Sequence, residues 1–394
     1  MDVLALRAIA ERRYDEFVGA LQEMVDVDCG SYTPEGVNMI ADLCERRLRD
    51  GGWSVTRTPH EPTDGAPQLG DLVVGTLRGA GGASVLLVGH TDTVFDEGTV
   101  AERPFRIDGD RALGPGVSDM KGGLLAGFFG VETLQEAGFD DFDRITYVCN
   151  PDEEIGSPFS GPVIRDLAPE HDAALVLEGA RANGDIVSAR KGITDYRIEM
   201  VGRAAHAGVE PEKGRNAVLE AAHKILALQG LNGRWPGVTV NVGMARGGTR
   251  SNVVPARCEL HVDLRSPEAS TLDEAAAEIE RICATSAVDD VVSSVEANGW
   301  HRPMEKGEGG RRLADIAIGV ASELGFELRD ASTGGASDAN TTSAAGIPTL
   351  DGLGPIGGDD HAPAEWLDLA SVVPRVTLLA GLLSRISPGL TPRR

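Results

Sequence analysis

Histidine and acidic residues follow or end three short apolar segments of the chain. They are His90 after residues 84–89 (SVLLVG), Glu153 and Glu154 after residues 145–150 (ITYVCN), and Glu178 at the end of residues 174–178 (ALVLE). Ligands of open α/β sheets bind beyond the carboxyl ends of the strands, so these side chains are expected to meet at one sheet edge. Imidazole nitrogens and carboxylate oxygens are suitable ligands for zinc and similar divalent ions.

Two glycine-rich loops carry further residues of the same chemical types. Residues 114–123 (GPGVSDMKGG) carry Asp119 towards the start of a helix, and residues 357–361 (GGDDH) end in His361. With the strand-end residues, they make a candidate set of two histidines and three carboxylates. The sequence therefore predicts a metal site assembled from five separate segments.

Each piece alone has an ordinary explanation. A His-x-Asp triplet is commonly a turn, and an Asp-Glu-Glu run is commonly a solvated charge cluster. Glu178 could be a helix cap or surface acid, and His361 could be a surface histidine. The combination of the five residues, in this order and at strand ends, favours the metal site.

The elements that must position these residues follow an α/β pattern. Short apolar runs alternate with amphipathic segments, which is typical of a mostly parallel sheet covered by helices. The expected helices of this part are residues 14–27, 33–50, 122–137, 310–324, 337–345 and 369–384. We predict a catalytic domain formed by residues 1–192 and 301–394.

The pattern changes after Gly192. Strands expected at 193–201, 238–245, 256–264 and 291–297 combine with helices at 216–229 and 272–284. The order β-α-β-β-α-β is that of a ferredoxin-like unit. We therefore predict that residues 193–300 form a separate α+β domain inserted into the first.

Composition limits the possible partners and the location. The chain of 394 residues has 37 Lys and Arg against 61 Asp and Glu, a net charge of −24, and only short basic clusters. Nucleic acid is therefore an unexpected partner. The five cysteines are odd in number and form no CxxC pair, the N-terminus lacks a signal peptide, and no apolar run is long enough for a membrane span. We expect a cytoplasmic protein without a disulfide framework.

Several motifs resemble those of the M20 metallopeptidases, and within them the glutamate carboxypeptidase (carboxypeptidase G) branch. The motifs are GHTDTVF at 89–95, RPFRIDGDRALGPGVSDMKGG at 103–123, NPDEEIGS at 150–157, LEG at 177–179, AAHAG at 204–208, GGTRSNVVPA at 247–256, VDLR at 262–265, GGASDAN at 334–340 and the loop of His361. They extend over most of the chain, in the order found in the family.

The resemblance implies a site for two zinc ions, with cobalt or manganese as possible replacements. His90 and Glu178 would complete one metal, Glu154 and His361 the other, and Asp119 would bridge them. The family also implies a cis peptide bond after the bridging aspartate. Met120 stands where the nearest branch often has an acid, and many relatives also carry methionine there.

The same resemblance gives roles to Glu153 and Asp92. Two nearby cations can share a water and lower its pKa. Glu153 would then take the proton of that water and pass it to the leaving amine. Asp92 would accept the second imidazole N–H of His90 and orient the ring.

By the same resemblance, the inserted domain is a lid or dimerisation domain and is expected to supply the substrate contacts. His206 resembles the family's lid histidine, which stabilises the oxyanion and usually acts across a homodimer. Asn252 and Arg265 resemble residues that bind the free carboxylate of the substrate, and Gly335 belongs to a turn that resembles a backbone cradle. Ordinary explanations are a surface histidine for His206, a strand-end ion pair for Arg265 and a simple turn around Gly335.

These expectations combine into a metal-dependent hydrolase that cleaves an amide or peptide bond next to a free carboxylate, acting on an acyl-amino acid or a peptide. Alternatives within the family are an N-acetyl- or succinyl-amino-acid deacylase of biosynthesis and a dipeptidase. A non-catalytic metal- or ligand-binding relative is an alternative of another class, but it would be expected to lose Glu153. Hydrolysis of an amine on an aromatic or heterocyclic compound also stays open, because one fold can host many chemistries.

Overall fold

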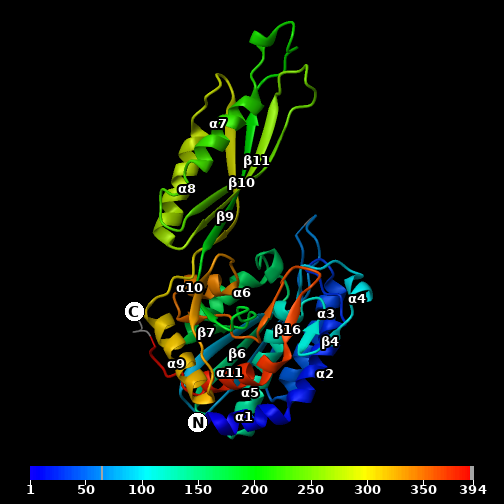
Figure 1. Cartoon of the computed structure of the whole chain (residues 1–394), viewed down its shortest axis with the longest axis vertical. Helices are drawn as coiled ribbons and strands as arrows, with labels where there is room; N and C mark the ends of the chain where they lie inside the picture. The colour runs from blue at the N-terminus through cyan, green and yellow to red at the C-terminus, as the bar shows by residue number, and fades with distance from the viewer. Residues whose placement is uncertain (64, 391–394) are drawn as a thin grey trace. The chain divides into compact units, whose positions relative to one another are not determined.

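The computed structural model describes residues 1–63 and 65–390 (Figure 1). Contacts between Cα atoms divide the chain into two compact units. Unit 1 comprises Met1–Ser188, Lys306–Thr333 and Ser337–Arg394, and unit 2 comprises Ala189–Glu305 and Gly334–Ala336. Each unit has its own cluster of buried apolar side chains, and each is described by itself below.

Unit 1 is built on a six-stranded sheet with the order β1-β2-β6-β3-β7-β14. Its strands are β1 (Ser54–Thr58), β2 (Leu72–Arg78), β3 (Ala83–His90), β6 (Phe142–Asn150), β7 (Ala173–Val176) and β14 (Thr349–Leu350). The central strands β6, β3, β7 and β14 run parallel, whereas β1 and β2 pair antiparallel at one edge. Every residue of β3 and β7 is buried, as the continuous apolar runs predicted.

Helices enclose this sheet. They are α1 (Val3–Arg12), α2 (Tyr14–Val25), α3 (Pro34–Asp50), α4 (Thr99–Glu102), α5 (Gly122–Glu136), α6 (Ser160–Leu167), α9 (Glu308–Leu324), α10 (Asp338–Ala344) and α11 (Val372–Leu383). α3 packs against β1 and β2, α5 against β3, and α10 against β7 and β14, while α11 packs against α5, α9 and α1. α5 is buried along almost its whole length because sheet and helices surround it.

Two smaller sheets complete this part of the chain. One has the order β15-β16-β5-β4 and joins β4 (Arg106–Asp108) and β5 (Arg111–Leu113) to β15 (Gly357–Gly358) and β16 (Trp366–Asp368). It therefore connects the segment before Asp119 with the segment around His361. The other pairs β8 (Ile186–Arg190) with β13 (Asp330–Thr333).

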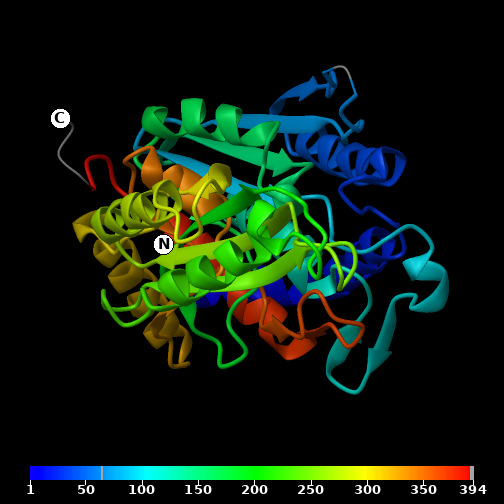
Figure 2. The same cartoon turned by 90° about the horizontal axis from the view of Figure 1, so that it is seen from above.

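Unit 2 has the ferredoxin-like order β9-α7-β10-β11-α8-β12. Its elements are β9 (Gly192–Val201), α7 (Ala217–Gln229), β10 (Thr239–Gly247), β11 (Arg257–Ser266), α8 (Ala269–Ala284) and β12 (Val292–His301). The sheet order is β10-β11-β9-β12, with every neighbouring pair antiparallel. α7 and α8 contact each other and pack on the sheet (Figure 1 and Figure 2).

The fold class predicted from the sequence is confirmed as an α/β arrangement with a mainly parallel sheet. The predicted strand at 174–178 is shorter than expected, since β7 ends at Val176 and Glu178 lies two residues beyond it. The domain boundaries at 192/193 and 300/301 stay a prediction. Among the described residues, no helix combines the length and the apolar character needed to cross a membrane.

Candidate metal centre

His90 is the last residue of β3, and its buried ring lies among carboxylates. Its Nε2 atom lies 3.1 Å from Oδ1 of Asp119 and 3.9 Å from Oε2 of Glu178. Its Nδ1 atom lies 2.9 Å from the backbone oxygen of Asp92 and 3.4 Å from Oδ1 of the same residue. The nearer acceptor for Nδ1 is thus the carbonyl of Asp92, with its carboxylate slightly farther away.

Asp119 lies between the two histidines. Its Oδ1 atom faces His90, while its Oδ2 atom lies 3.1 Å from Nε2 of His361. The same Nε2 atom lies 3.2 Å from Oε2 of Glu154. The peptide bond between Asp119 and Met120 is cis, as the resemblance implied. The five predicted ligands therefore converge, and the two oxygens of Asp119 point to separate histidines.

The negative charges of the carboxylates in this cluster favour the binding of a positive ion. Hydrogen bonds to Asp119 and Glu154 raise the pKa of His361 to about 10, despite partial burial. Burial lowers the pKa of His90, but its contacts with Asp119 and Asp92 outweigh burial and hold that pKa well above the usual value. Oε1 of Glu154 is buried and has no hydrogen-bond partner among the described residues. Protonated histidines thus supply charge that divalent cations could supply instead, and the donor set fits such ions.

Asp92 connects the histidine strand to the loop that carries the two glutamates. Its carboxylate accepts hydrogen bonds from the backbone N–H groups of Glu153 and Glu154, both at 3.2 Å. It also accepts one from Oγ of Ser31 at 2.7 Å. Burial raises the pKa of Glu153 well above its usual value, and the nearby Glu178 adds to that shift. A carboxylate that holds a proton readily has the character of a general base.

A network behind the glutamate loop fixes its path. Oγ of Ser157 donates to Oδ1 of Asp338 at 2.6 Å, and the side-chain amide of Asn150 donates to Oδ2 of the same residue at 2.5 Å. Asp152 accepts from the backbone N–H of Phe159 at 2.6 Å. Burial raises the pKa of Asp338 to about 6, although the Ser157 and Asn150 hydrogen bonds oppose the shift. The loop between β6 and α6 is therefore held at both ends.

Glu365 holds the loop of Asp119 and was not among the residues predicted from the sequence. Its buried carboxylate accepts the N–H groups of Gly116 at 2.9 Å, Ser118 at 2.8 Å and Asp119 at 3.0 Å. Burial raises its pKa to about 7, against the effect of these donors. In the sequence, the only sign of this role was the position of Glu365 four residues after His361. Its contacts with residues 116–119 depend on the folding of distant segments.

The predicted substrate-binding residues belong to unit 2. Arg265 forms a bidentate ion pair with Asp263, in which Nη2 lies 2.9 Å from Oδ2 and Nε lies 3.0 Å from Oδ1. The Nη1 atom of Arg265 donates to the carbonyl of Gly334 at 2.8 Å. The carbonyl of Gly335 accepts from Nη1 of Arg190 at 3.1 Å. The turn at 334–336 is therefore tied to two arginines.

His206 and Asn252 lie on neighbouring backbone segments of unit 2. The N–H of Ala207 donates to the carbonyl of Asn252 at 3.0 Å, and His206 pairs with Val253 in an isolated bridge. Both His206 and Asn252 are exposed. Nδ1 of His206 accepts the N–H of Gly208 at 3.1 Å.

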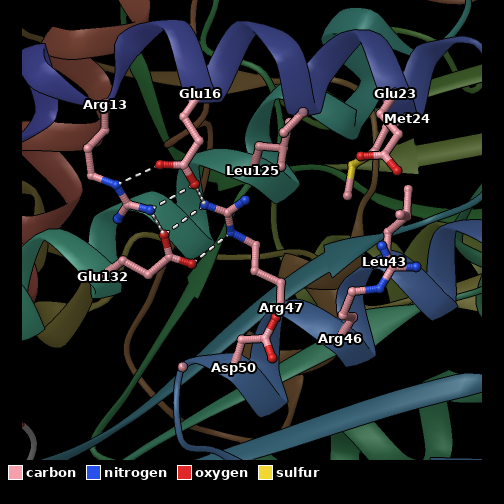
Figure 3. Close-up of a pocket in the computed structure, with 12 residues that line it drawn as sticks. Arg13, Glu16, Glu23, Met24, Leu43, Arg46, Arg47, Asp50, Leu125 and Glu132 are labelled. Carbon is pink, nitrogen blue, oxygen red and sulfur yellow. Dashed lines mark hydrogen bonds and ion pairs between the residues drawn. The ribbon is translucent and has the colours of Figure 1, made fainter.

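A separate hollow of about 380 Å³ lies among α2, α3 and α5, and two of its arginines, Arg13 and Arg47, form ion pairs with glutamates of its lining (Figure 3). Arg47 binds Glu132 at 2.7 Å and Glu16 at 3.0 Å, and Arg13 binds Glu132 at 2.6 Å. Both guanidinium groups also lie over the ring of Phe129. Because these charges neutralise one another, the hollow is a structural junction between helices rather than a candidate anion site.

The chain is similar to known proteins in sequence and in fold. Carboxypeptidase G2 of Pseudomonas sp. (strain RS-16) is 31% identical over 94% of this chain and 89% of its own length. An acetylornithine deacetylase of Shigella sonnei is 32% identical over 60% of this chain and 62% of its own. Among solved structures, aminopeptidase PepT of Bacillus cereus superposes with a TM-score of 0.78 at 22% identity, covering 95% of this chain and 98% of that one.

A second solved structure is named for the same family as the sequence motifs. It is an M20 family metallo-carboxypeptidase from Sulfolobus solfataricus, with a TM-score of 0.72 at 17% identity, covering 94% of this chain and 98% of that one. The sequence profile of peptidase family M20/M25/M40 matches residues 86–385, a range that contains all five predicted ligands. The chain therefore belongs to the peptidase family M20/M25/M40.

Proposed function

We propose that this protein is a metal-dependent hydrolase that cleaves an amide or peptide bond adjacent to a free carboxylate and releases an amino acid. The observation that carries the proposal is the convergence of His90, Asp119, Glu154, Glu178 and His361 around Glu153. The similarity to carboxypeptidase G2 over nearly the whole chain supports the same reaction. Glutamate is our first choice for the released amino acid.

The five ligands would hold two zinc ions, with cobalt or manganese as substitutes. In this assignment, His90 and Glu178 serve one ion, His361 and Glu154 serve the other, and Asp119 serves both through its two oxygens. When bound, the ions supply Lewis-acid chemistry at the scissile carbonyl and at a water molecule. The pairing of each Asp119 oxygen with a different histidine supports this assignment.

Glu153 would act as the general base and then as the acid. Its carboxylate takes a proton from the attacking water, whose oxygen forms the new bond to the carbonyl carbon, and the same proton passes to the nitrogen when the C–N bond breaks. Asp92 positions Glu153 and Glu154 through their backbone N–H groups. It also lies against the ring of His90, which fixes the orientation of that ligand.

Unit 2 would contribute substrate recognition and a homodimer contact. We propose that Arg265 and Asn252 bind the substrate carboxylate, that the backbone around Gly335 supports it, and that His206 stabilises the oxyanion in the partner's site. The exposed position of His206 is compatible with such a role. β10 is an edge strand with mostly exposed residues, and α7 exposes Leu226, which supports a contact with a second copy.

Metal removal and one substitution test the function. Thorough chelation should abolish hydrolysis of N-acyl-glutamates, and added zinc or cobalt should restore it. Glu153→Gln should bind metal as the wild type does and reduce kcat by about a hundredfold or more, since general catalysis contributes about 10²–10⁴. Metal content and kcat should be measured on the same preparations, and a variant with near-normal kcat would refute Glu153 as the base.

A second candidate function is deacylation of N-acetyl or N-succinyl amino acids. The identity of 32% with an acetylornithine deacetylase favours it, although the match covers only 60% of this chain. A panel of N-acyl amino acids decides between the two. If acetylornithine or succinyl-diaminopimelate is hydrolysed far faster than acyl-glutamates, the deacylase assignment replaces the first.

A further inference from the structure

Asp263 of unit 2 has no part in the proposed reaction, but it lies beside the proposed carboxylate-binding residue Arg265. Both belong to β11, two residues apart, so their side chains project from the same face of the sheet. The alternate residues of β11 are buried in the apolar cluster of unit 2, beneath α7 and α8. Asp263 and Arg265 therefore stand on the opposite face, where their side chains are 29% and 36% exposed.

The carboxylate of Asp263 binds one edge of the guanidinium group of Arg265. Nε of Arg265 lies 3.0 Å from Oδ1 and 3.1 Å from Oδ2, and Nη2 lies 2.9 Å from Oδ2. Asp195 pairs with Asp263 across β9 and β11, and its charge also attracts Arg265. The guanidinium group is thus held against the sheet by two carboxylates.

The other terminal nitrogen of Arg265 contacts a segment that is distant in the sequence. Nη1 donates to the carbonyl of Gly334 at 2.8 Å, 69 residues further along the chain. The next residue is Gly335, whose carbonyl accepts from Arg190 at 3.1 Å. Through Arg265, Asp263 therefore also holds the turn that we propose as a support for the substrate carboxylate.

The contacts of Arg265 leave a defined part of its guanidinium group available. A guanidinium group has about five N–H donors in a planar fork. Asp263 accepts from Nε and Nη2, and Gly334 accepts from Nη1, with no further acceptor among the described residues. One N–H therefore remains on each terminal nitrogen, and a carboxylate can accept two parallel hydrogen bonds from such a pair. Without Asp263, the long side chain could adopt other rotamers.

We propose that Asp263 is a positioning residue, which fixes the guanidinium plane of Arg265 so that its two remaining N–H groups receive the carboxylate of the substrate. The proposal rests on the proposed function, in which Arg265 binds that carboxylate. Selectivity for a carboxylate over an uncharged amide then depends on Asp263, which does not touch the substrate. The alternative is an ordinary surface ion pair, which contributes little to stability and nothing to selectivity.

Two substrates that differ only in the recognised group test this role in the metal-loaded enzyme. They are the N-acyl amino acid that the wild type hydrolyses fastest and the amide of its free carboxylate. The wild type should prefer the carboxylate by at least about a hundredfold in kcat/KM, because a site that hydrogen-bonds a group rejects an analogue without it. Asp263→Asn should lower this preference by about tenfold or more, since small displacements of a positioning group are costly. The loss should appear mainly in KM for the carboxylate substrate.

Glu259→Gln is the matched control, because Glu259 forms a similar ion pair on the same strand and the same face. Its Oε2 atom lies 2.7 Å from Nε and 2.5 Å from Nη2 of Arg197, and the two side chains are 27% and 43% exposed. This variant should keep the wild-type KM and preference. Asp263→Glu retains the negative charge and should keep more of the preference than Asp263→Asn. Urea unfolding shows that each variant is folded under the assay conditions.

Arg265→Met shows whether Asp263 acts through Arg265. Asp263→Asn should change the preference in the wild-type background and have no further effect in combination with Arg265→Met. An unchanged preference in both Asp263→Asn and Asp263→Glu, or an effect of Asp263→Asn that persists beside Arg265→Met, would overturn the positioning role alone. A wild type without preference, or a wild-type preference in Arg265→Met, would instead refute the recognition of the carboxylate by Arg265, and the positioning role with it.

Discussion

Glu365 shows how a residue outside the proposed ligand set can hold the loop of a proposed metal ligand in place. Its two oxygens accept three backbone N–H groups from residues 116–119, and it follows His361 by four residues. One carboxylate thus connects the loop of the proposed bridging ligand with the loop of a terminal ligand. Partners of this kind orient ligands without touching the metal.

We expect Glu365→Gln to weaken metal binding by about tenfold to a hundredfold, because the amide NH₂ cannot accept the N–H groups that one oxygen now accepts. Competition with a chromophoric chelator measures this affinity directly. Glu220→Gln is the matched control, since Glu220 is also buried and accepts two backbone N–H groups, from Ala287 and Val288, in unit 2. Unchanged metal affinity in Glu365→Gln would show that the loop is held by other contacts.

The proximity of the residues next to strand ends could be expected from the sequence. His90, Glu153 and Glu154 follow apolar runs, so their meeting at one edge could be expected from the sheet alone. Glu365 and Asp338 could not be found in this way, since their partners lie far away in the chain. Buried polar networks depend on three-dimensional packing, which local patterns do not encode.

At the scale of elements, α5 approaches the chain segment of Glu178 closely. A Cβ atom on Gly123 would lie 1.7 Å from the carbonyl oxygen of Leu177, the residue before Glu178. Only glycine allows the helix to pack at this distance. The first turn of α5 therefore determines where Glu178 can lie.

We expect Gly123→Ala to destabilise the protein by about 1–3 kcal/mol and to lower metal affinity, because the methyl group must push the helix away from Leu177. Gly19→Ala is the control within a helix: Gly19 lies inside α2, and its Cβ would contact nothing within 4 Å. That change should instead stabilise the helix by about 0.5–1 kcal/mol. Urea unfolding and chelator competition measure the two effects, and a fully stable Gly123→Ala protein with normal metal affinity would contradict the close approach.

His171 links β6 to the end of α6 and should make stability depend on pH. Its Nδ1 lies 2.8 Å from the carbonyl of Leu167 and its Nε2 lies 2.8 Å from Oγ1 of Thr146, which suits a neutral ring that donates once and accepts once. Burial lowers the pKa of His171 below its ordinary value of 6.5. Below pH 6.5, His171 binds a proton in the unfolded chain more readily than in the folded chain. The contribution of His171 to the free energy of unfolding is therefore complete above pH 6.5 and is lost as the pH falls.

The expected result is a smaller loss of stability between pH 7.5 and pH 5.5 in His171→Gln than in the wild type. The free energy of unfolding in urea at the two pH values gives the comparison. Equal losses in both proteins would mean that the ring binds a proton as readily in the folded chain as in the unfolded chain, against the hydrogen-bond pattern.

The helices predicted for unit 1 all appear in the structure, whereas α1, α4, α6 and most strands of this unit were not predicted. Every predicted helix of unit 1 corresponds to an observed one within three residues at each end, because apolar periodicity and terminal glycine or proline residues mark their limits. β1 and β2 were not predicted, since β1 lies at a partly exposed sheet edge and lacks a continuous apolar run. The short strands β15 and β16 belong to one sheet with β4 and β5, and their local sequences do not indicate strands.

At the scale of the whole molecule, each unit has the features of an independent folding domain. The apolar cluster of unit 2 draws only on residues from Tyr196 to Val291, apart from partly buried neighbours such as Val295. Near the two ends of this unit in the sequence, the backbones of Arg190 and Met304 form two hydrogen bonds of 3.0 Å. A domain with its own core and paired ends is expected to fold alone.

We expect a fragment of residues 189–305 to fold cooperatively in isolation, as measured by circular dichroism during urea unfolding. A fragment limited to the boundaries predicted from the sequence, 193–300, lacks the Arg190–Met304 pairing and part of β9 and β12, and should be less stable. Non-cooperative unfolding of the longer fragment would show that unit 2 needs unit 1. Equal stability of the two would support the shorter boundaries.

The bond between Glu365 and the loop of Asp119 also has a consequence for biosynthesis. The ribosome delivers Asp119 first, and His361 and Glu365 follow it by 242 and 246 residues. Until then, the loop at residues 116–119 lacks the carboxylate that holds it, and the proposed ligand set lacks a histidine. We therefore expect a nascent chain that ends before His361 to lack the proposed hydrolase activity.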